Sequence, residues 1–359
     1  MLFRSLGASL HAEAGWDSLS IGLDVAASRL EPALELLAEM GAHPTFPARE
    51  VERLRDERLN DILQAHADPR RRADEAFIDA IYVPGSPYHR PAAGLAATVA
   101  GLDRDAVERT YRRAFDPAGM TLVVGGDLAG LDVPAIAGRL LGGWTRTPEA
   151  GARTAIVADS ALRGGLLRVH HRPGAVQTEV RIGGVGLPRQ IPDYHAVVVM
   201  SAILGGLFAS RLNMKIREEK GYAYGAHAGF DLRRAAGPWS ARAAVNTEVS
   251  VPATLDMLGE LRRMRDERVT DDELRDAREF LVGVFPLRFE TPGPVVSSIA
   301  GLAVHGLPDD ELARYRPAIE AVTAADVQAA ARAHLDVDGA ALVVGTREAP
   351  PRSSWVLVR

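Results

Sequence analysis

Residues 211–225 read RLNMKIREEKGYAYG and join a helix end to a strand start around one glycine. The first part predicts a helix that Gly221 ends, and the alternating tyrosines that follow predict a strand. Arg217 lies near the end of this helix, and Tyr224 follows it by seven residues across the turn. We therefore expect the guanidinium and the phenol on one side of a cavity, where both can donate hydrogen bonds to a peptide carbonyl or a developing oxyanion.

The segment also has a plainer interpretation. Lys and Arg are common in the last turn of helices, because they interact favourably with the helix dipole. Tyrosines in a strand can simply pack against a core. On this segment alone, a binding site and a basic helix end with two core-facing aromatics both stay open.

An internal repeat organises the chain. The run LVVG occurs at 122–125 and again at 342–345, with further identities around it. A second pair of blocks shares Gly, Ala, Gly and Asp at equivalent places. Each copy of the first block predicts an amphipathic helix, a turn and a short buried strand. The matched blocks, which indicate a duplication, are 99–126 with 319–346 and 7–17 with 221–231.

The two halves contain the same kinds of element. Pro69 and Pro292 mark helix starts or breaks at comparable places. Strands mixed with helix pairs, without strict alternation, favour the α+β class, built as two duplicated α/β sandwich halves. The predicted strands are 18–28 and 240–250, and the predicted helices are 32–41, 50–65, 253–265 and 272–284.

The two halves differ at their starts. The second half opens with a lead-in, residues 166–220, that the first half lacks, because Gly7 already corresponds to Gly221. The first half is therefore predicted to be incomplete at its N-terminus. The lead-in predicts strands at 167–171 and 177–185 and a helix at 194–207.

These patterns predict a division into two repeats. We expect a first, N-terminally truncated repeat at 1–145 and a second repeat at 166–359 that carries Arg217 and Tyr224. Residues 146–165 show no periodicity and are predicted to link the two.

Composition describes an ordinary globular protein and excludes several functions. The chain has 359 residues, a net charge of −5, 47% hydrophobic and 25% charged residues, and no cysteine, so disulfides and thiolate nucleophiles are excluded. No basic stripe with interleaved aromatics indicates nucleic-acid binding. The longest apolar runs, such as 196–204, are too short to span a membrane. The first residues do not read as a signal peptide, and the compartment stays unknown, with a bacterial periplasm or cytoplasm both open.

Several motifs together resemble those of the pitrilysin-type zinc peptidases, the inverzincin group that includes the mitochondrial processing peptidase. The segment 211–225 is similar to that family's L-R-E-x-x-G-x-A-Y, and ILGG at 203–206 with SRL at 210–212 is similar to its L-G-G…S-R-L. HRPGAVQ at 171–177 resembles the strand before its P-x-A-P-Q turn, and AFDPAGMTLVVGG at 114–126 resembles its Y-x-P-x-N-x-x-L-v-v-v-G-d. The resemblance covers essentially the whole chain.

The resemblance implies roles for residues of the second half. In the family, the arginine and tyrosine lie opposite a zinc site borne by the other half and help to hold substrate. Carried over, this gives Arg217 and Tyr224 a role in binding the substrate carbonyl or transition state within a complex. Gly225, Ala226 and Gly229 are expected beside the substrate, because small residues let backbones approach closely.

The catalytic motif of that family, H-x-x-E-H, does not occur in this sequence. The helix that carries it in the family would precede residue 1 here. The family's further glutamate ligand corresponds to Asp61, and its accompanying glutamate corresponds to Leu54, so no metal site is expected and Asp61 is a degenerate position. Glu57 and Asp61 are four residues apart and leave a rebuilt site open, although a solvated helix face is the favoured interpretation.

Other hydrolytic and nucleotide-binding motifs do not occur either. The sequence has neither a G-x-S-x-G elbow nor a G-x-x-x-x-G-K-[ST] loop. His170 and His171 are adjacent in a predicted strand, so they point to opposite faces and cannot easily share a metal.

The favoured hypothesis is a non-catalytic, substrate-binding subunit of a heterodimeric zinc metalloendopeptidase that acts on short or unfolded peptides. Its partner would be a homologous chain that carries H-x-x-E-H and the zinc. Two alternatives stay open: a catalytically inactive scaffold or protein-interaction homologue, and a truncated product of a peptidase gene. A pure scaffold has no physical need for both Arg217 and Tyr224, which argues for the first hypothesis.

Overall fold

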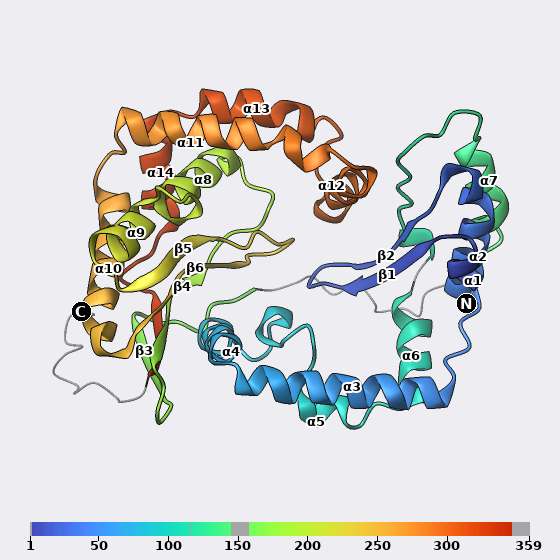
Figure 1. The fold of residues 1–359 in the computed structure, drawn as a ribbon, viewed down its shortest axis with the longest axis horizontal. Coiled ribbons are helices and arrows are strands. Elements are labelled where there is room, and N and C mark those ends of the chain that lie inside the picture. Colours follow the sequence, from blue (N-terminus) through green and yellow to red (C-terminus); the bar gives the residue numbers. More distant parts are fainter. Residues whose placement is uncertain (1, 116, 145–157, 347–359) are drawn as a thin grey trace. The chain divides into compact units, whose positions relative to one another are not determined.

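The computed structural model describes residues 2–115, 117–144 and 158–346, and these form two compact units (Figure 1). Each unit mixes helices and strands, which confirms the α+β class. Unit 1 comprises Met1–Leu63, Ala92–Ala155 and Arg288–Leu307, and unit 2 comprises Gln64–Pro91, Ile156–Leu287 and Pro308–Arg359.

Unit 2 is built on a five-stranded sheet with the order β3-β7-β4-β6-β5. β3 pairs with β7 in parallel, and the other neighbouring strands pair antiparallel. The strands at 167–171 and 177–185 were predicted correctly, but β7, from the chain's C-terminal part, lies between them. The strands are β3 (Leu166–His171), β4 (Gln177–Val185), β5 (Ala223–Phe230), β6 (Pro238–Asn246) and β7 (Ala341–Thr346).

Both faces of this sheet are covered, as the central strand β4 makes clear. Seven consecutive residues of β4 are buried, a pattern typical of a strand covered on both sides. Val180 and Ile182 join the main hydrophobic core, whereas Arg181 and Gly183 face α4 (Pro69–Ile81). Alternating side chains of one strand therefore contact helices on opposite faces.

The remaining helices of unit 2 pack into the main core. α8 (Tyr194–Ser201) packs on α14 (Ala324–His334) and α13 (Glu311–Ala321), and α11 (Asp271–Val284) packs on α13. α10 (Ser250–Asp266) covers β4 and β6. The helices predicted at 253–265 and 272–284 are thus confirmed, as α10 and α11.

One helical run in this unit is long and apolar enough to cross a membrane. Residues Tyr194–Glu219 include an 18-residue window of mean hydropathy 1.6, of which 61% is buried inside the protein. The sequence prediction of no membrane span considered only shorter, uninterrupted apolar runs. Burial of this longer run in the protein core gives a structural reason for its apolar composition.

Unit 1 contains a two-stranded antiparallel sheet of β1 (Ser9–Ala14) and β2 (Leu19–Asp24). The helices predicted at 32–41 and 50–65 are present as α2 and α3. α2 packs on α7, and the Tyr111 hydroxyl donates a hydrogen bond to the carbonyl of Gly41 (2.6 Å). The helices are α1 (Leu2–Ser5), α2 (Leu30–Ala42), α3 (Ala48–Ala67), α5 (Ala96–Val99), α6 (Arg104–Ala114), α7 (Val133–Leu141) and α12 (Pro292–His305).

The strand predicted at 122–125 is wrong. These residues belong to no strand of the described structure and Leu122 is 42% exposed, whereas the same letters at 342–345 form part of buried β7. In unit 2, β7 is flanked by β3 and β4 from the lead-in at 166–220. Unit 1 has no described counterpart of these two strands, so the run LVVG at 122–125 lacks the two flanking strands that hold β7 in its sheet.

Each sequence half contributes one helix to the compact unit that the other half mainly forms, and each of these helices starts at a predicted proline. Pro69 opens α4 after an N-cap at Asp68, and Pro292 opens α12, so both prolines are confirmed as helix starts. α4 comes from the first half of the sequence and belongs to unit 2, whereas α12 comes from the second half and belongs to unit 1. Each compact unit thus combines segments of both sequence halves. The division into repeats at 1–145 and 166–359 stays a prediction, and residues 146–157 of the predicted linker lie outside the described residues. The internal duplication stays a prediction.

Candidate functional site

Arg217 lies on a helix that departs from α-helical geometry. The chain after α8 continues through η4 (Ala202–Gly206), α9 (Arg211–Asn213) and η5 (Met214–Glu219), and both η4 and η5 are π-helical. Single π turns inside helices are frequent at functional sites. Arg217 lies in the second of them.

Gly221 ends this helix as the sequence predicted. Its φ is +64°, in the left-handed region that glycine occupies without steric cost. Its N–H donates to the Arg217 carbonyl at 3.0 Å, and the Tyr222 N–H donates to the Ile216 carbonyl at 2.9 Å. The turn leads directly into β5, which carries Tyr224.

The structure brings Arg217 and Tyr224 together and adds Phe208. The Cζ atom of Arg217 lies 4.9 Å from the ring centroid of Tyr224 and 4.7 Å from that of Phe208. Both distances fit cation–π contacts. Tyr224 is 89% exposed and Phe208 64% exposed. The interpretation of Tyr224 as a core-facing aromatic is therefore wrong.

Asn213 fixes the backbone around this cluster. Its Nδ2 donates to the Phe208 carbonyl at 2.7 Å, and its Oδ1 accepts from the Ala226 N–H at 3.3 Å. The register of β5 against β6 shifts between Ala223 and Ala226, where Tyr224 and Gly225 lie. Bulges of this kind re-aim side chains next to binding sites.

The predicted small residues on β5 have different surroundings. Among the described residues, a Cβ placed on Gly229 would meet no atom within 4 Å, and one on Gly225 would meet only ordinary contacts at 3.6 Å, to Asn213 and His227. Ala226 is fully buried and therefore lies in the core. Packing within the described chain thus does not require glycine at 225 or 229.

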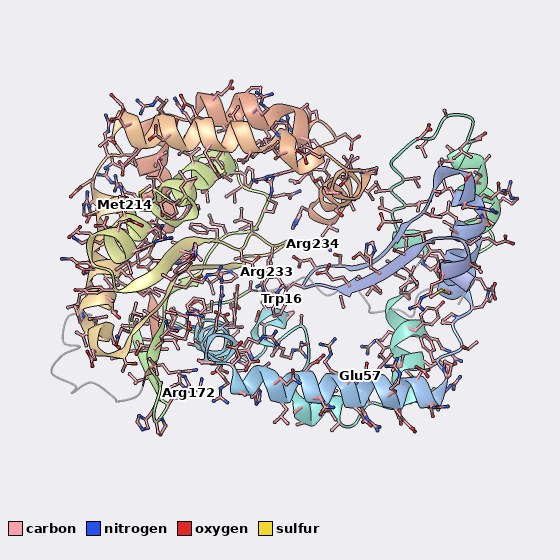
Figure 2. All side chains as sticks on the ribbon, viewed as in Figure 1. Trp16, Glu57, Arg172, Met214, Arg233 and Arg234 are labelled. Atoms are coloured by element: carbon pink, nitrogen blue, oxygen red, sulfur yellow. The ribbon has the colours of Figure 1, made fainter. Side chains whose placement is uncertain are left out.

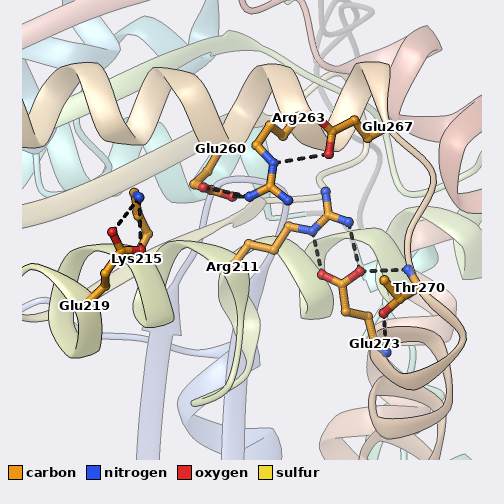
Figure 3. Close-up of polar contacts among 8 residues, drawn as sticks. All are labelled: Arg211, Lys215, Glu219, Glu260, Arg263, Glu267, Thr270 and Glu273. Carbon is orange, nitrogen blue, oxygen red and sulfur yellow. Dashed lines mark hydrogen bonds and ion pairs between the residues drawn. The ribbon is translucent and has the colours of Figure 1, made fainter.

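The helix that carries Arg217 is anchored by other ionic side chains (Figure 3). Arg211 forms a bidentate pair with Glu273 of α11, at 2.6 and 2.9 Å, and the backbone N–H of Thr270 donates to the same carboxylate at 2.8 Å. Burial raises the pKa of Glu273, but the hydrogen bonds from Arg211 and Thr270 outweigh burial and the net shift is downward. Lys215 binds Glu219 one turn along, and this hydrogen bond raises the pKa of Lys215 and lowers that of Glu219.

Arg217 takes no part in this anchoring. Its ion-pair partner among the described residues is its chain neighbour Glu218, at 3.1 Å. Its side chain is 31% exposed. A guanidinium carries five N–H donors, so most of these stay available to a ligand.

The described residues do not fit a zinc site. No three His, Cys, Asp or Glu side chains in the described ranges lie close enough together to hold a metal. Asp61 is 62% exposed and pairs with Arg58 at 3.7 Å. Glu57, labelled on α3 in Figure 2, pairs with Arg53 at 2.5 Å, and Leu54 is 54% exposed. Asp61 and Glu57 thus belong to a solvated ionic helix face, and no catalytic step is assigned to a metal on these residues.

Sequence reasoning missed Phe208, Asn213 and the two π-helical turns. Phe208 lies two residues after the glycine pair 205–206, and a large aromatic between glycines and a polar turn is a signal that could have identified it. Nothing in the sequence identified Asn213, because its two hydrogen bonds join segments that meet only in the folded chain.

Comparison with known proteins identifies the family. A family model described as the peptidase M16 inactive domain matches residues 101–281, which is half of this chain. An uncharacterized zinc protease of Mycobacterium leprae is 26% identical over 245 residues, which span 67% of this chain but only 54% of that relative. The non-peptidase homolog YmxG of Helicobacter pylori is 23% identical over 313 residues, 86% of this chain and 70% of that protein.

A solved structure agrees with this assignment. The crystal structure of a peptidase M16 inactive domain from Pseudomonas fluorescens matches with a TM-score of 0.88 and 25% identity. The match covers 97% of this chain and 84% of that chain. The resemblance inferred from the motifs is thereby confirmed, and the chain belongs to the peptidase M16 inactive-domain family.

Proposed function

We propose that this chain is the non-catalytic, substrate-binding subunit of a heterodimeric zinc metalloendopeptidase that acts on short or unfolded peptides. The main observation behind the proposal is the pair of Arg217 and Tyr224, in contact at 4.9 Å and solvent-accessible. Neither residue belongs to the ionic network that anchors the Arg217 helix. Family membership and the name of the Helicobacter relative, a non-peptidase homolog, support a catalytically inactive chain. The zinc and H-x-x-E-H would belong to the partner.

The two side chains suit a developing oxyanion. A guanidinium forms charge-assisted hydrogen bonds to oxygen, and a phenol hydroxyl adds a neutral donor. Donors already in place when negative charge develops contribute more than donors that must reorganise. Arg217 is held against two rings, and this contact limits the positions that its head group can take.

The strand beside the pair suits an extended peptide. β5 is the last strand in the order of its sheet, and no described strand pairs with its outer edge. A peptide can add to such an edge through backbone hydrogen bonds. The open space at Gly229 and the loose contacts at Gly225 leave room for a second backbone there.

The first test is purification of the chain from its native cells, followed by identification of stoichiometric partners. We expect a homologous chain that carries H-x-x-E-H, at a ratio near one to one, and peptide hydrolysis that a zinc chelator abolishes. A monomer, or a homodimer without zinc or peptidase activity, would contradict the proposal and would favour a scaffold.

The second test uses variants of the purified complex. Arg217→Ala should lower kcat/KM for an unstructured peptide by roughly tenfold to a thousandfold, the usual effect of losing one oxyanion donor. Arg275→Ala is the matched control, because Arg275 is a half-exposed arginine of the same unit that pairs with Asp272 and Asp276. Unchanged turnover for Arg217→Ala, with normal assembly, would remove the role assigned to this residue.

A further inference from the structure

We propose that Phe208 is a positioning and specificity-determining residue, which holds the Arg217 guanidinium and forms one wall of a subsite for an apolar or aromatic peptide side chain. The inference rests on the proposed function, since it concerns the peptide that Arg217 and Tyr224 would bind. It adds a residue that neither the sequence motifs nor the family assignment singles out.

The first argument is the contact itself. Arg217 lies 4.7 Å from the Phe208 ring, slightly closer than its 4.9 Å contact with Tyr224. Aromatic rings contact the planar faces of a guanidinium, whereas its N–H donors lie in the guanidinium plane. Ring contacts therefore orient the head group without using the donors that a carbonyl would need.

The second argument is how the chain holds Phe208 in place. The Phe208 carbonyl accepts a hydrogen bond from Nδ2 of Asn213 at 2.7 Å, and the Ser210 N–H donates to the Leu207 carbonyl at 3.2 Å. The Leu207 N–H in turn closes the π-helical turn on Ala202 at 3.1 Å. The backbone on both sides of Phe208 is thus hydrogen-bonded, although the side chain is 64% exposed.

The third argument is the chemistry of the surface. Phe208 and Tyr224 expose two large aromatic side chains beside one cation and one sheet edge that pairs with no described strand. Apolar surface of this kind, rimmed by polar groups, is typical of interaction sites. The rings favour an apolar or aromatic side chain, and the Arg217 charge repels Lys and Arg. The expected ligand is therefore an extended peptide with an apolar or aromatic residue next to the bound carbonyl.

The test compares matched peptides in the purified complex. The peptides differ only at one residue flanking the cleaved bond, which is Phe, Leu, Ala or Lys in turn. With the parent complex we expect kcat/KM to favour Phe and Leu over Lys. Phe208→Ala should lower kcat/KM for the Phe peptide at least tenfold and should reduce the discrimination between Phe and Ala.

Two conservative variants separate positioning from subsite formation. Phe208→Tyr keeps the ring and should therefore retain both the rate and the selectivity of the parent complex. Phe208→Leu keeps apolar surface without a ring, so it should retain part of the KM selectivity but lower kcat. Phe280→Ala is the control, because Phe280 is a 50% exposed phenylalanine of α11 in the same unit.

The outcomes distinguish this inference from the proposed function. If Arg217→Ala lowers turnover but Phe208→Ala leaves both rate and selectivity unchanged, the inference is wrong and the function stands. An equal loss for all four peptides would overturn the subsite. If Arg217→Ala has no effect on an active complex, or if no complex exists, the function and this inference fail together.

Discussion

Arginine side chains in unit 2 are held in two different ways. Arg211 and Arg181 are buried and bind carboxylates, Arg211 on Glu273 and Arg181 on Glu179 and Asp74. Arg217 lies instead against two exposed rings. The first kind of contact satisfies a buried charge, which is a structural requirement. The second leaves hydrogen-bond donors available, which is a requirement of binding.

Arg181 gives a stability prediction at the scale of one residue. Its side chain is 2% exposed and Glu179, which binds it at 2.8 Å, is 10% exposed. Arg181→Met should lower the free energy of unfolding by about 3–5 kcal/mol, because it leaves the Glu179 carboxylate buried without a cation. Urea unfolding measures this, and Arg181→Met combined with Glu179→Gln should recover part of the loss. A single variant as stable as the parent would contradict the ionic account.

His195 gives a prediction about pH. Burial lowers its pKa, and its Nε2 is buried with no hydrogen-bond partner among the described residues, while its ring contacts those of Tyr194 and Tyr315. The unfolded chain then binds a proton at higher pH than the folded chain, so stability falls as pH falls below the ordinary histidine pKa of about 6.5.

The measurement is the free energy of unfolding between pH 7 and pH 5. Its slope should be positive in this window, with about 1.4 kcal/mol per pH unit as the limit for one proton. His195→Gln should reduce the slope. An unchanged slope for His195→Gln would assign the pH dependence to other groups, among which His170, with a pKa also lowered by burial, is the first candidate.

The two aromatic contacts of Arg217 show which neighbouring residues can be predicted from the sequence. Arg217 and Tyr224 were predicted to meet because a glycine turn separates them by a fixed short distance along the chain. Phe208 was not predicted, because its contact depends on the π-helical turn η5 that carries Arg217 and on the π-helical turn η4 that ends just before Phe208. Helical spacing rules assume regular α-geometry and therefore give the wrong neighbours across such turns.

At the scale of elements, packing between a helix and a strand requires glycine at position 205 but not at positions 225 and 229. A Cβ on Gly205 of η4 would lie 2.1 Å from the backbone nitrogen of Ala228 in β5, which is closer than atoms can approach. Gly205→Ala should therefore push the helix and strand apart, at a cost of about 1–3 kcal/mol. Chemical unfolding measures this, and stability within 0.5 kcal/mol of the parent, an outcome typical of surface sites, would contradict the close approach.

Gly225 and Gly229 should behave in the opposite way. Alanine at either position meets ordinary contacts or open space, so stability should stay unchanged or rise slightly. If a peptide backbone lies against them, both variants should weaken peptide binding to the folded complex severalfold, as measured by KM or by fluorescence anisotropy with an inhibitor peptide. Unchanged binding in both would remove these glycines from the site.

Many element boundaries could be predicted because their signals are local. The two prolines marked where α4 and α12 begin, and Gly221 with the tyrosines after it marked where η5 ends and β5 begins. The strand at 122–125 failed because strand formation needs a paired edge. A buried-strand pattern describes the side chains and not the availability of partners.

At the scale of the whole molecule, the exchange of α4 and α12 makes the two sequence halves depend on each other. Fragments 1–157 and 158–359, each expressed alone, lack one helix of their own compact unit. Phe77 of α4 is 4% exposed and covers Gly183 of β4, so removal of α4 exposes one face of the sheet. We expect each fragment to aggregate alone and the two to form a one-to-one complex when expressed together.

Affinity purification through a tag on one fragment measures this. Phe77→Ala in fragment 1–157 should weaken the complex, since truncation of a buried phenylalanine costs about 3–5 kcal/mol. Two soluble fragments that each unfold cooperatively alone would contradict the prediction. The sequence could not predict the exchange, because helix patterns show which residues are buried and not which sheet buries them.

The repeated run LVVG has one more consequence. Four identical residues occur in a paired strand at 342–345 and outside any strand at 122–125. Their side-chain chemistry, and hence their intrinsic rates of amide hydrogen exchange, are closely matched, so the protein contains its own reference. Deuterium uptake at 122–125 divided by uptake at 342–345 reports how far strand pairing slows exchange. A chain or peptide that supplied the missing strand edges to the first run would bring this ratio toward one.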